Sequence, residues 1–374
     1  MGFQVTELYK KYGDKVVVDH LSFEMKEPGV YALLGTNGAG KTTSIRMILN
    51  MLAKDGGSVE WNGGPLTLQT CNVGYLAEER GLYPKNTLMD QLMYFAALRG
   101  VPRAEAKQRI QYWAERLEAT EYLYPPQESK RPVKPKKADQ LSKGNQQKIQ
   151  FMLALLSDPE LLILDEPLSG LDPVNTDLFK SIIHEEIGKG KYLIMSSHQM
   201  ATIEEFCTDL TILNRSKTVL QGNLAEIKKG YGRINLFIKA EQDLQRMIEA
   251  AGITVLSSVG FSYQCRVSGE AQANALLKDL VSKGIPLIAF ELREPSLHEI
   301  FVEKVGETHE EQYSARCRNC FPLHDAAAVQ NALGHYFSAD SVSHCSISNA
   351  HFGAGFRKLK GDQRNRHSDA LSAE

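Results

Sequence analysis

The sequence is poor in the features that mark secreted and membrane-spanning chains. Six cysteines in 374 residues are too few for a disulfide framework, which favours a reducing compartment. The longest apolar runs, such as Val30–Leu34 and Leu161–Leu164, fall far short of the about 20 residues that cross a bilayer. The N-terminus lacks a basic start followed by an apolar stretch, so no secretory signal is expected. These absences predict a protein that resides in the cytoplasm.

The chain also lacks an excess of charge of either sign. Its 43 Lys and Arg residues nearly balance 45 Asp and Glu residues, for a formal net charge of -2. Proteins that bind nucleic acid through its phosphates usually carry a clear basic excess, so a nucleic-acid partner is not expected. The composition, 43% hydrophobic and 24% charged, is typical of globular proteins, and the chain is long enough for two or three domains.

Apolar strands alternate with helical patterns over residues 1–230, as in a layered α/β domain with a mostly parallel sheet. Val30–Leu34, Leu161–Leu164 and Tyr192–Met195 are almost wholly apolar, which predicts buried strands. After the first of them, apolar residues at helical spacing predict a helix over Thr42–Leu52.

Strand signals are missing from about residue 87 to residue 157, where amphipathic patterns such as Leu88–Leu98 and Ala104–Leu117 predict helices. A helical insertion is therefore expected to interrupt the sheet. Within it, Tyr124–Lys137 combines four prolines with five basic residues, which predicts a mobile surface loop. The loop could contact acidic lipid headgroups or a partner, or it could be a solvated loop with no partner. The solvated loop is the simpler interpretation.

The pattern changes near residue 230. Strand and helix signals follow in the order βαββαβ over residues 231–305, which predicts a small ferredoxin-like α+β domain closed by a helix over Ser296–Val305. From Gly306 onward periodicity fails and Ser, Ala, His, Asn and Arg dominate, so residues 306–374 are expected to be a disordered tail.

The tail contains side chains of the types that bind zinc: Cys317, Cys320, His324, His344 and Cys345. A structural zinc site needs four ligands that converge, and the segment between the two histidines shows little folded patterning. A disordered appendage without metal is the preferred interpretation.

A phosphate-binding loop is the strongest motif. Gly35-Thr36-Asn37-Gly38-Ala39-Gly40-Lys41-Thr42 matches the Walker A pattern G-x-x-x-x-G-K-[ST] between a buried strand and a helix, as that motif requires. Glycines let the backbone curl so that several N–H groups converge on phosphate oxygens, and the helix N-terminus adds partial positive charge. Lys41 is expected to reach the β- and γ-phosphates, and the Thr42 hydroxyl to ligate Mg²⁺.

Two acidic residues end another buried strand. Asp165 and Glu166 follow Leu161–Leu164, and carboxylates at the C-terminal tip of such a strand lie at the ligand crevice of an α/β sheet. Asp165 is expected to hold Mg²⁺ through water, and Glu166 to polarise the attacking water. An acidic strand end alone is a weak indication of a nucleotide site, and it becomes a strong one because the chain also contains the phosphate loop.

Five further segments resemble the ATPase subunit of ATP-binding cassette (ABC) transporters, over about residues 3–230. Leu141–Gln147 is similar to the family's signature motif, Ser169–Asp172 to its D-loop and Ser196–His198 to its switch-histidine motif. Tyr12, before the first long strand, resembles the aromatic residue that stacks on adenine, and Tyr75–Glu79 occupies the place of the Q-loop.

The resemblance implies that two cassettes pair head to tail, each ATP lying between one copy's phosphate loop and the other copy's signature motif. The residues implied to contact ATP are Tyr12, Gly35, Thr36, Asn37, Gly38, Ala39, Gly40, Lys41, Thr42, Thr43, Ser142, Gly144 and Asp172. Ser142 and Gly144 would donate to the γ-phosphate across the interface, and Asp172 would link the two sites. His198 would bind the γ-phosphate and align the water. Thr42, Glu78 and Asp165 are the implied Mg²⁺ ligands.

The chain departs from the family pattern at four of these positions. Glu78 stands where most relatives carry Gln; it still accepts Mg²⁺ but cannot donate an amide hydrogen bond. Lys143 and Asn145 replace Gly and Gln of the usual signature, and Thr36 replaces a common Pro. The two signature positions that face ATP are kept, so activity is expected, with slow turnover as an alternative.

The segment Glu78–Lys85 and the signature Leu141–Gln147 resemble a prokaryotic branch that serves ABC-2-type exporters of sodium, drugs or secretion-related cargo and carries a small C-terminal domain. This implies an ATP-hydrolysing homodimer on the inner face of the cell membrane, held there by a separate transmembrane permease. Two alternatives stay open: a soluble ABC ATPase acting on DNA or ribosomes, and a nucleotide-binding regulator with little turnover.

Overall fold

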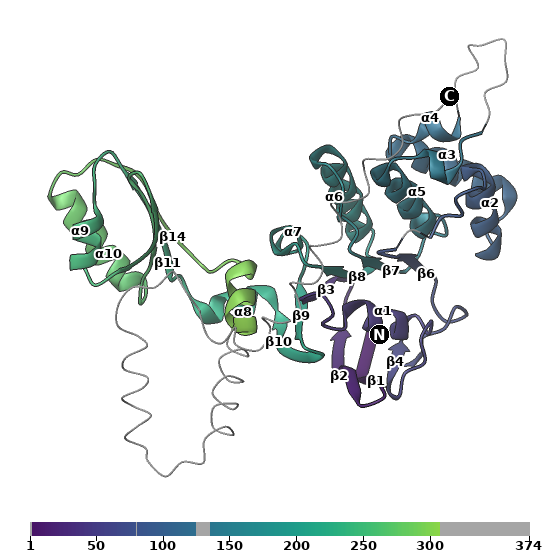
Figure 1. Cartoon of the computed structure of the whole chain (residues 1–374), viewed down its shortest axis with the longest axis horizontal. Helices are drawn as coiled ribbons and strands as arrows, with labels where there is room; N and C mark the ends of the chain where they lie inside the picture. The colour runs from purple at the N-terminus through teal and green to yellow at the C-terminus, as the bar shows by residue number, and fades with distance from the viewer. Residues whose placement is uncertain (1, 80, 125–134, 307–374) are drawn as a thin grey trace, which may run out of the picture. The chain divides into compact units, whose positions relative to one another are not determined.

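The computed structural model describes residues 2–79, 81–124 and 135–306 (Figure 1). Most of the predicted loop over Tyr124–Lys137 lies outside these ranges. So do the predicted tail from residue 307 onward and its candidate zinc ligands. Within the described ranges, no helix is both long and apolar enough to cross a membrane.

A six-stranded sheet forms the centre of the predicted cassette, in the order β10-β9-β3-β8-β7-β6. Its strands are β3 (Gly29–Gly35), β6 (Val73–Leu76), β7 (Leu161–Asp165), β8 (Tyr192–Ser197), β9 (Asp209–Asn214) and β10 (Lys217–Asn223). All neighbouring strands are parallel except β9 and β10, which form an antiparallel hairpin. Every residue of β3 and β7 is buried, which explains their continuous apolar sequences.

The two faces of the sheet belong to different apolar cores. In β3, Ala32 and Leu34 pack with the helical side, whereas Tyr31 and Leu33 pack on the opposite side. Alternate residues of a strand point to opposite faces, so one short strand contributes to both cores. Figure 1 shows α5 and α6 on one side of this sheet, and α1 with β1, β2 and β4 on the other.

A second, antiparallel sheet covers the α1 side and was not predicted. Its order is β2-β1-β4-β5, with strands β1 (Phe3–Tyr12), β2 (Lys15–Met25), β4 (Gly56–Trp61) and β5 (Gly64–Pro65). Tyr12 is the last residue of β1, so the expectation that it precedes the first long strand is wrong. The long strand β1 owes its buried positions to partners on both sides, Phe3 pairing with Met25 and with Trp61.

The predicted helix over Thr42–Leu52 is also too long. Helix α1 spans Lys41–Ile48, and Asn50 adopts the left-handed conformation with φ of 56°. Leu49 and Leu52 still pack against the core from the turn that follows. Apolar spacing therefore continues past the helix because these side chains stay partly buried against the core.

The predicted helical insertion is present. Its elements are α2 (Leu88–Leu98), α3 (Arg103–Arg116), α4 (Thr120–Leu123), the 3₁₀ turn η1 (Ala138–Gln140) and α5 (Lys143–Leu155). Helices α6 (Pro173–Gly188) and α7 (Met200–Glu204) follow β7 and β8. Side chains of Thr87, Ser142 and Asp172 accept backbone N–H groups at the starts of α2, α5 and α6.

The small C-terminal domain has the predicted ferredoxin-like topology. Helix α8 (Leu224–Tyr231) precedes it, and its elements are β11 (Asn235–Ala240), α9 (Gln245–Ala250), β12 (Thr254–Val259), β13 (Ser262–Arg266), α10 (Glu270–Ser282) and β14 (Leu287–Arg293). The antiparallel order β12-β13-β11-β14 places the first and third strands side by side, as the βαββαβ unit requires. A helix over residues 297–306 follows, and Leu297 and Phe301 join the cassette's apolar cluster. The domain boundaries at residues 230 and 305 stay predictions.

Candidate nucleotide-binding site

The phosphate loop joins β3 to α1, as the motif requires. The N–H of Ala39 donates to the carbonyl of Thr36 over 3.1 Å, which closes a tight turn between them. Gly40 stands at the N-cap of α1 with no side-chain cap, so backbone N–H groups at this helix start remain for a ligand. A helix N-terminus with open N–H groups favours phosphate.

Two glycines of the loop differ in why a side chain is excluded. A Cβ on Gly40 (φ +107°) would lie 2.5 Å from the carbonyl oxygen of Val17 in β2. Gly38 (φ +77°) has the same left-handed backbone, but nothing lies within 4 Å of a Cβ placed there. The first position therefore needs glycine for space and conformation, the second for conformation alone.

Lys41 is 7% exposed and folds back over the loop. Its ammonium donates to the carbonyl oxygen of Gly35 over 2.9 Å and lies 3.9 Å from a carboxylate oxygen of Glu166. The lysine thus connects the phosphate loop to the acidic end of β7, where the predicted reacting groups lie.

Asp165 ends β7 and faces the start of α1. Its Oδ1 accepts from the Thr42 hydroxyl over 3.4 Å and from the Ser196 hydroxyl over 2.5 Å. Its Oδ2 is buried and has no hydrogen-bond partner among the described residues. Burial raises the pKa of Asp165 above its usual range. Oxygen donors are the ligands that Mg²⁺ prefers, and a bare buried carboxylate oxygen beside a hydroxyl fits such a cation.

Glu166 follows Asp165 in the left-handed conformation, with φ of 51°. The residue is 6% exposed, and Oε2 lies 2.8 Å from Nδ1 of His198. Because a carboxylate only accepts hydrogen bonds, Nδ1 carries the hydrogen in this contact, and Nε2 is the nitrogen left for another partner. The His198 side chain is 53% exposed, so it can reach a ligand.

The structure therefore brings five of the predicted residues together: Lys41, Thr42, Asp165, Glu166 and His198. They come from β3–α1, β7 and β8, which are neighbouring parallel strands whose C-terminal ends share one edge of the sheet. Ligands bind at that edge in open α/β sheets.

The remaining predicted residues lie in other parts of the cassette. Ser142 caps α5, where its hydroxyl accepts from the N–H of Asn145 over 3.3 Å, and Gly144 is in the first turn of that helix. Asp172 caps α6, and hydrogen bonds from Asn175 lower its pKa. Tyr12 is 54% exposed, with the Lys10 ammonium 5.4 Å from its ring centroid. Glu78 is exposed in the loop after β6. Their predicted contacts with ATP or Mg²⁺ stay predictions.

One residue of the site had no predicted role. Ser196 was quoted as part of the switch-histidine motif, but its hydroxyl contacts both Asp165 and Glu166. No local pattern could assign it, because the contact depends on β8 lying beside β7.

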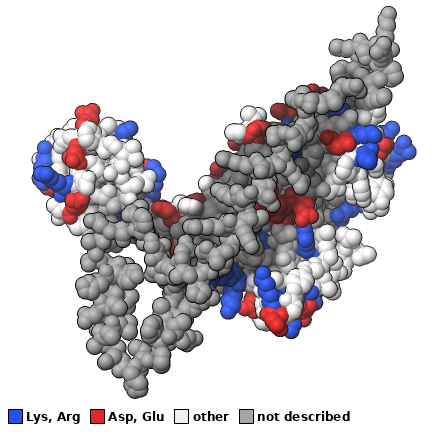
Figure 2. Space-filling model, in the orientation of Figure 1, with Lys and Arg blue, Asp and Glu red and all other residues white. Residues whose placement is uncertain are grey.

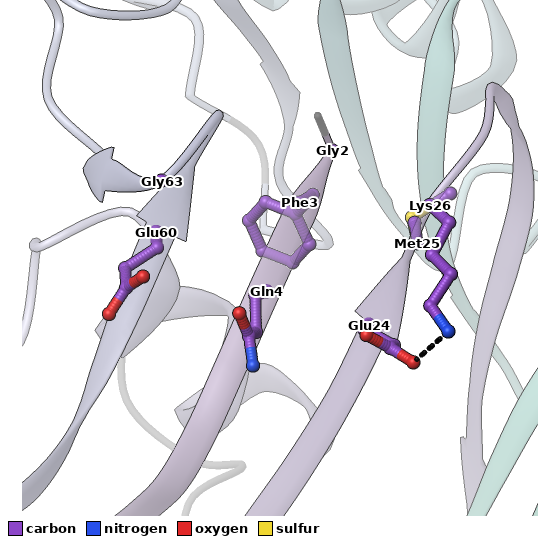
Figure 3. Close-up of a pocket in the computed structure, with 8 residues that line it drawn as sticks. All are labelled: Gly2, Phe3, Gln4, Glu24, Met25, Lys26, Glu60 and Gly63. Carbon is purple, nitrogen blue, oxygen red and sulfur yellow. Dashed lines mark ion pairs between the residues drawn. The ribbon is translucent and has the colours of Figure 1, made fainter.

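One described pocket is separate from this site. A pocket of about 180 Å³ lies at one end of the antiparallel sheet, where Glu60, Gln4 and Glu24 follow one another across β4, β1 and β2 (Figure 3). It contains none of the predicted site residues. Lys and Arg side chains are intermixed with Asp and Glu on the described part of the face in Figure 2, in keeping with the balanced charge.

Comparisons with known proteins show the family. The family model for ABC transporter matches residues 18–169, and the model for ATP-binding protein DrrA1-3-like, C-terminal domain, matches residues 222–305. YhaQ of Bacillus subtilis, an uncharacterized ABC transporter ATP-binding protein, is 43% identical over 82% of this chain and 99% of its own length. The chain belongs to the ABC transporter ATP-binding proteins.

Two other relatives of this ABC protein have more specific names. The linearmycin resistance ATP-binding protein LnrL of Bacillus subtilis is 27% identical over 82% of this chain and 98% of its own length. The Nod factor export ATP-binding protein I of Ralstonia nicotianae is 31% identical over 60% of this chain and 67% of its own length. A solved ATP binding subunit of an ABC transporter superposes with a TM-score of 0.55 at 27% identity, over 62% of this chain and 93% of that one.

Proposed function

We propose that this ABC protein binds and hydrolyses ATP and thereby drives export through a separate ABC-2-type membrane permease. The observation that carries the proposal is the meeting of Lys41, Thr42, Asp165, Glu166 and His198 at one sheet edge beside an open helix N-terminus. These groups supply what phosphoryl transfer to water needs: charge for the phosphates, oxygens for a metal, and an oriented base.

In the proposed reaction, water attacks the γ-phosphorus and the bond to the bridging oxygen of ADP breaks. Glu166 accepts the proton of the attacking water; its Oε2 is held by His198 and its Oε1 lies 3.9 Å from the Lys41 ammonium, so the carboxylate is already oriented. Lys41 turns from the loop carbonyls to the phosphates. Mg²⁺, when bound by Thr42 and Asp165, would neutralise phosphate charge.

ATP is proposed to act by joining two copies of the chain. Ser142 and Gly144 head α5, whose N-terminal dipole favours the γ-phosphate of ATP bound to the other copy. Hydrolysis removes that bridging charge, so the copies separate, and the permease senses the change. The relatives named for Nod factor export and for linearmycin resistance support this coupling. The permease would hold the chain on the inner face of the cell membrane.

Phosphate release by the purified full chain tests hydrolysis. Replacing Glu166 with Gln is expected to lower the turnover number by roughly 10²–10⁴-fold, because it removes the base and keeps the side-chain volume. Glu226→Gln, at an exposed residue of α8, is the matched control and should hydrolyse ATP like the unmodified chain. Equal rates in Glu166→Gln and the control would contradict the assignment of the base.

Co-expression with any membrane proteins encoded beside it tests the coupling to export. The chain is expected to sediment with membranes and to purify in detergent with a hydrophobic partner. Recovery wholly apart from membranes would contradict the coupling. ATP hydrolysis in such a preparation, with salt-dependent binding to DNA or ribosomes, would favour the soluble alternative instead.

A further inference from the structure

Ser196 occupies a position that no predicted role accounts for. It is fully buried in β8, between the strand that leads to the phosphate loop and the strand that ends in the acidic pair. The backbone register places it directly opposite Leu33 of β3 and Asp165 of β7. A hydroxyl at this point is enclosed by the three strands that build the site.

Its single hydroxyl serves both acidic residues. Ser196 Oγ donates to Asp165 Oδ1 over 2.5 Å and accepts the backbone N–H of Glu166 over 3.1 Å. The donation occupies one oxygen of Asp165, and the other, Oδ2, is the bare buried oxygen that fits a cation. The same N–H also donates to the Ser196 backbone carbonyl over 3.2 Å, so the turn at Glu166, with φ of 51°, has a second acceptor, whereas the bond to Asp165 depends on the hydroxyl alone.

We propose that Ser196 is a positioning residue whose hydroxyl orients Asp165 toward the metal. This inference rests on the proposed function and goes one step further, since it assigns the choice of carboxylate oxygen to a residue that touches neither ATP nor water. Without the hydroxyl, Asp165 keeps Thr42 as a donor at 3.4 Å, a weaker restraint on the rotation of its carboxylate.

Metal binding distinguishes positioning from mere structural support. Mn²⁺, which is visible by electron paramagnetic resonance, is titrated into the full chain with a non-hydrolysable ATP analogue, and binding of the same analogue is measured in chelator without metal. Ser196→Ala is expected to weaken Mn²⁺ binding by roughly 10–100-fold, as loss of groups that orient metal ligands does, and to leave metal-free binding within about twofold. Ser196→Thr keeps the hydroxyl and should restore Mn²⁺ affinity.

The matched control is Thr211→Val, which removes another fully buried hydroxyl from the same sheet. Thr211 lies in β9 and its hydroxyl bonds to the phenol of Tyr31 over 2.7 Å, away from the acidic pair. The Thr211→Val variant should melt at a lower temperature than the unmodified chain and bind Mn²⁺ with the same affinity. If the added methyl group of Ser196→Thr prevents folding, Ser196→Cys, with its weaker donor, should bind Mn²⁺ with an affinity between those of Ser196→Ala and the unmodified chain.

Two results would overturn the inference: Mn²⁺ affinity of Ser196→Ala within about twofold of the control, or an equal loss of metal-free nucleotide binding, which would mean that the whole site had deformed. The proposed function fails differently. In that case the unmodified chain itself neither binds the analogue nor hydrolyses ATP.

Discussion

Replacing Gly40 and Gly38 with alanine, one at a time, tests the geometry of the phosphate loop. Both residues have left-handed backbones, which cost an L-residue about 1–2 kcal/mol. Only the Cβ at Gly40 meets an obstacle, the Val17 carbonyl oxygen at 2.5 Å, where overpacking adds about 1–3 kcal/mol. We therefore expect a loss of about 1–2 kcal/mol for Gly38→Ala and about 2–5 kcal/mol for Gly40→Ala.

Thermal unfolding of the nucleotide-free chain measures the difference. At roughly 2–4 °C per kcal/mol, Gly40→Ala should melt several degrees below Gly38→Ala. It should also bind ATP more weakly in chelator, since a shifted Val17 strand moves the start of α1. Equal melting temperatures of the two variants would refute the reasoning, because of the two added Cβ atoms only that of Gly40 meets the close approach of β2.

Two further predictions concern charges outside the reacting groups. Lys191→Met should lower the free energy of unfolding by about 1.5–3 kcal/mol, because it removes one of the two lysines that pair with the fully buried Glu186 and leaves Lys189. The double variant Glu186→Gln/Lys191→Met should recover most of that loss in denaturant titrations. Asp172→Ala should destabilise the chain at neutral pH. Hydrogen bonds from Asn175 lower the folded pKa of Asp172, so its contribution to stability is present above the unfolded pKa of about 3.9 and is lost as pH falls through the lower folded pKa. The free energies of unfolding of the variant and the unmodified chain should therefore become equal in acid. A stability difference that does not change with pH would contradict this.

The parts of the site that could be predicted are those whose residues lie close together in the sequence. The phosphate loop needs glycines, a lysine and a hydroxyl at fixed spacing, and the acidic pair directly follows an apolar strand. The ferredoxin-like unit could be predicted because its strands and helices alternate with clear periodicity and short connections. In each case residues that are neighbours in the sequence are enough to make the prediction.

What could not be predicted depends on partners far away in the sequence. The second sheet forms because Phe3 pairs with both Met25 and Trp61, and no local pattern shows that pairing. The end of α1 at Ile48 was missed because Leu49 and Leu52 remain packed against the core, partly buried, after the helix stops. Ser196 acquires its contacts only when β8 is placed between β3 and β7.

The central claim is that intact ATP joins two copies of this chain and that hydrolysis releases them. Light scattering of the full-length Glu166→Gln variant, with and without ATP and Mg²⁺, tests it most directly, because binding is kept and the release step is blocked. The account predicts a doubling of molar mass on adding ATP and Mg²⁺, and no change when Lys41→Ala is introduced as well. A variant that binds ATP yet stays monomeric would contradict it.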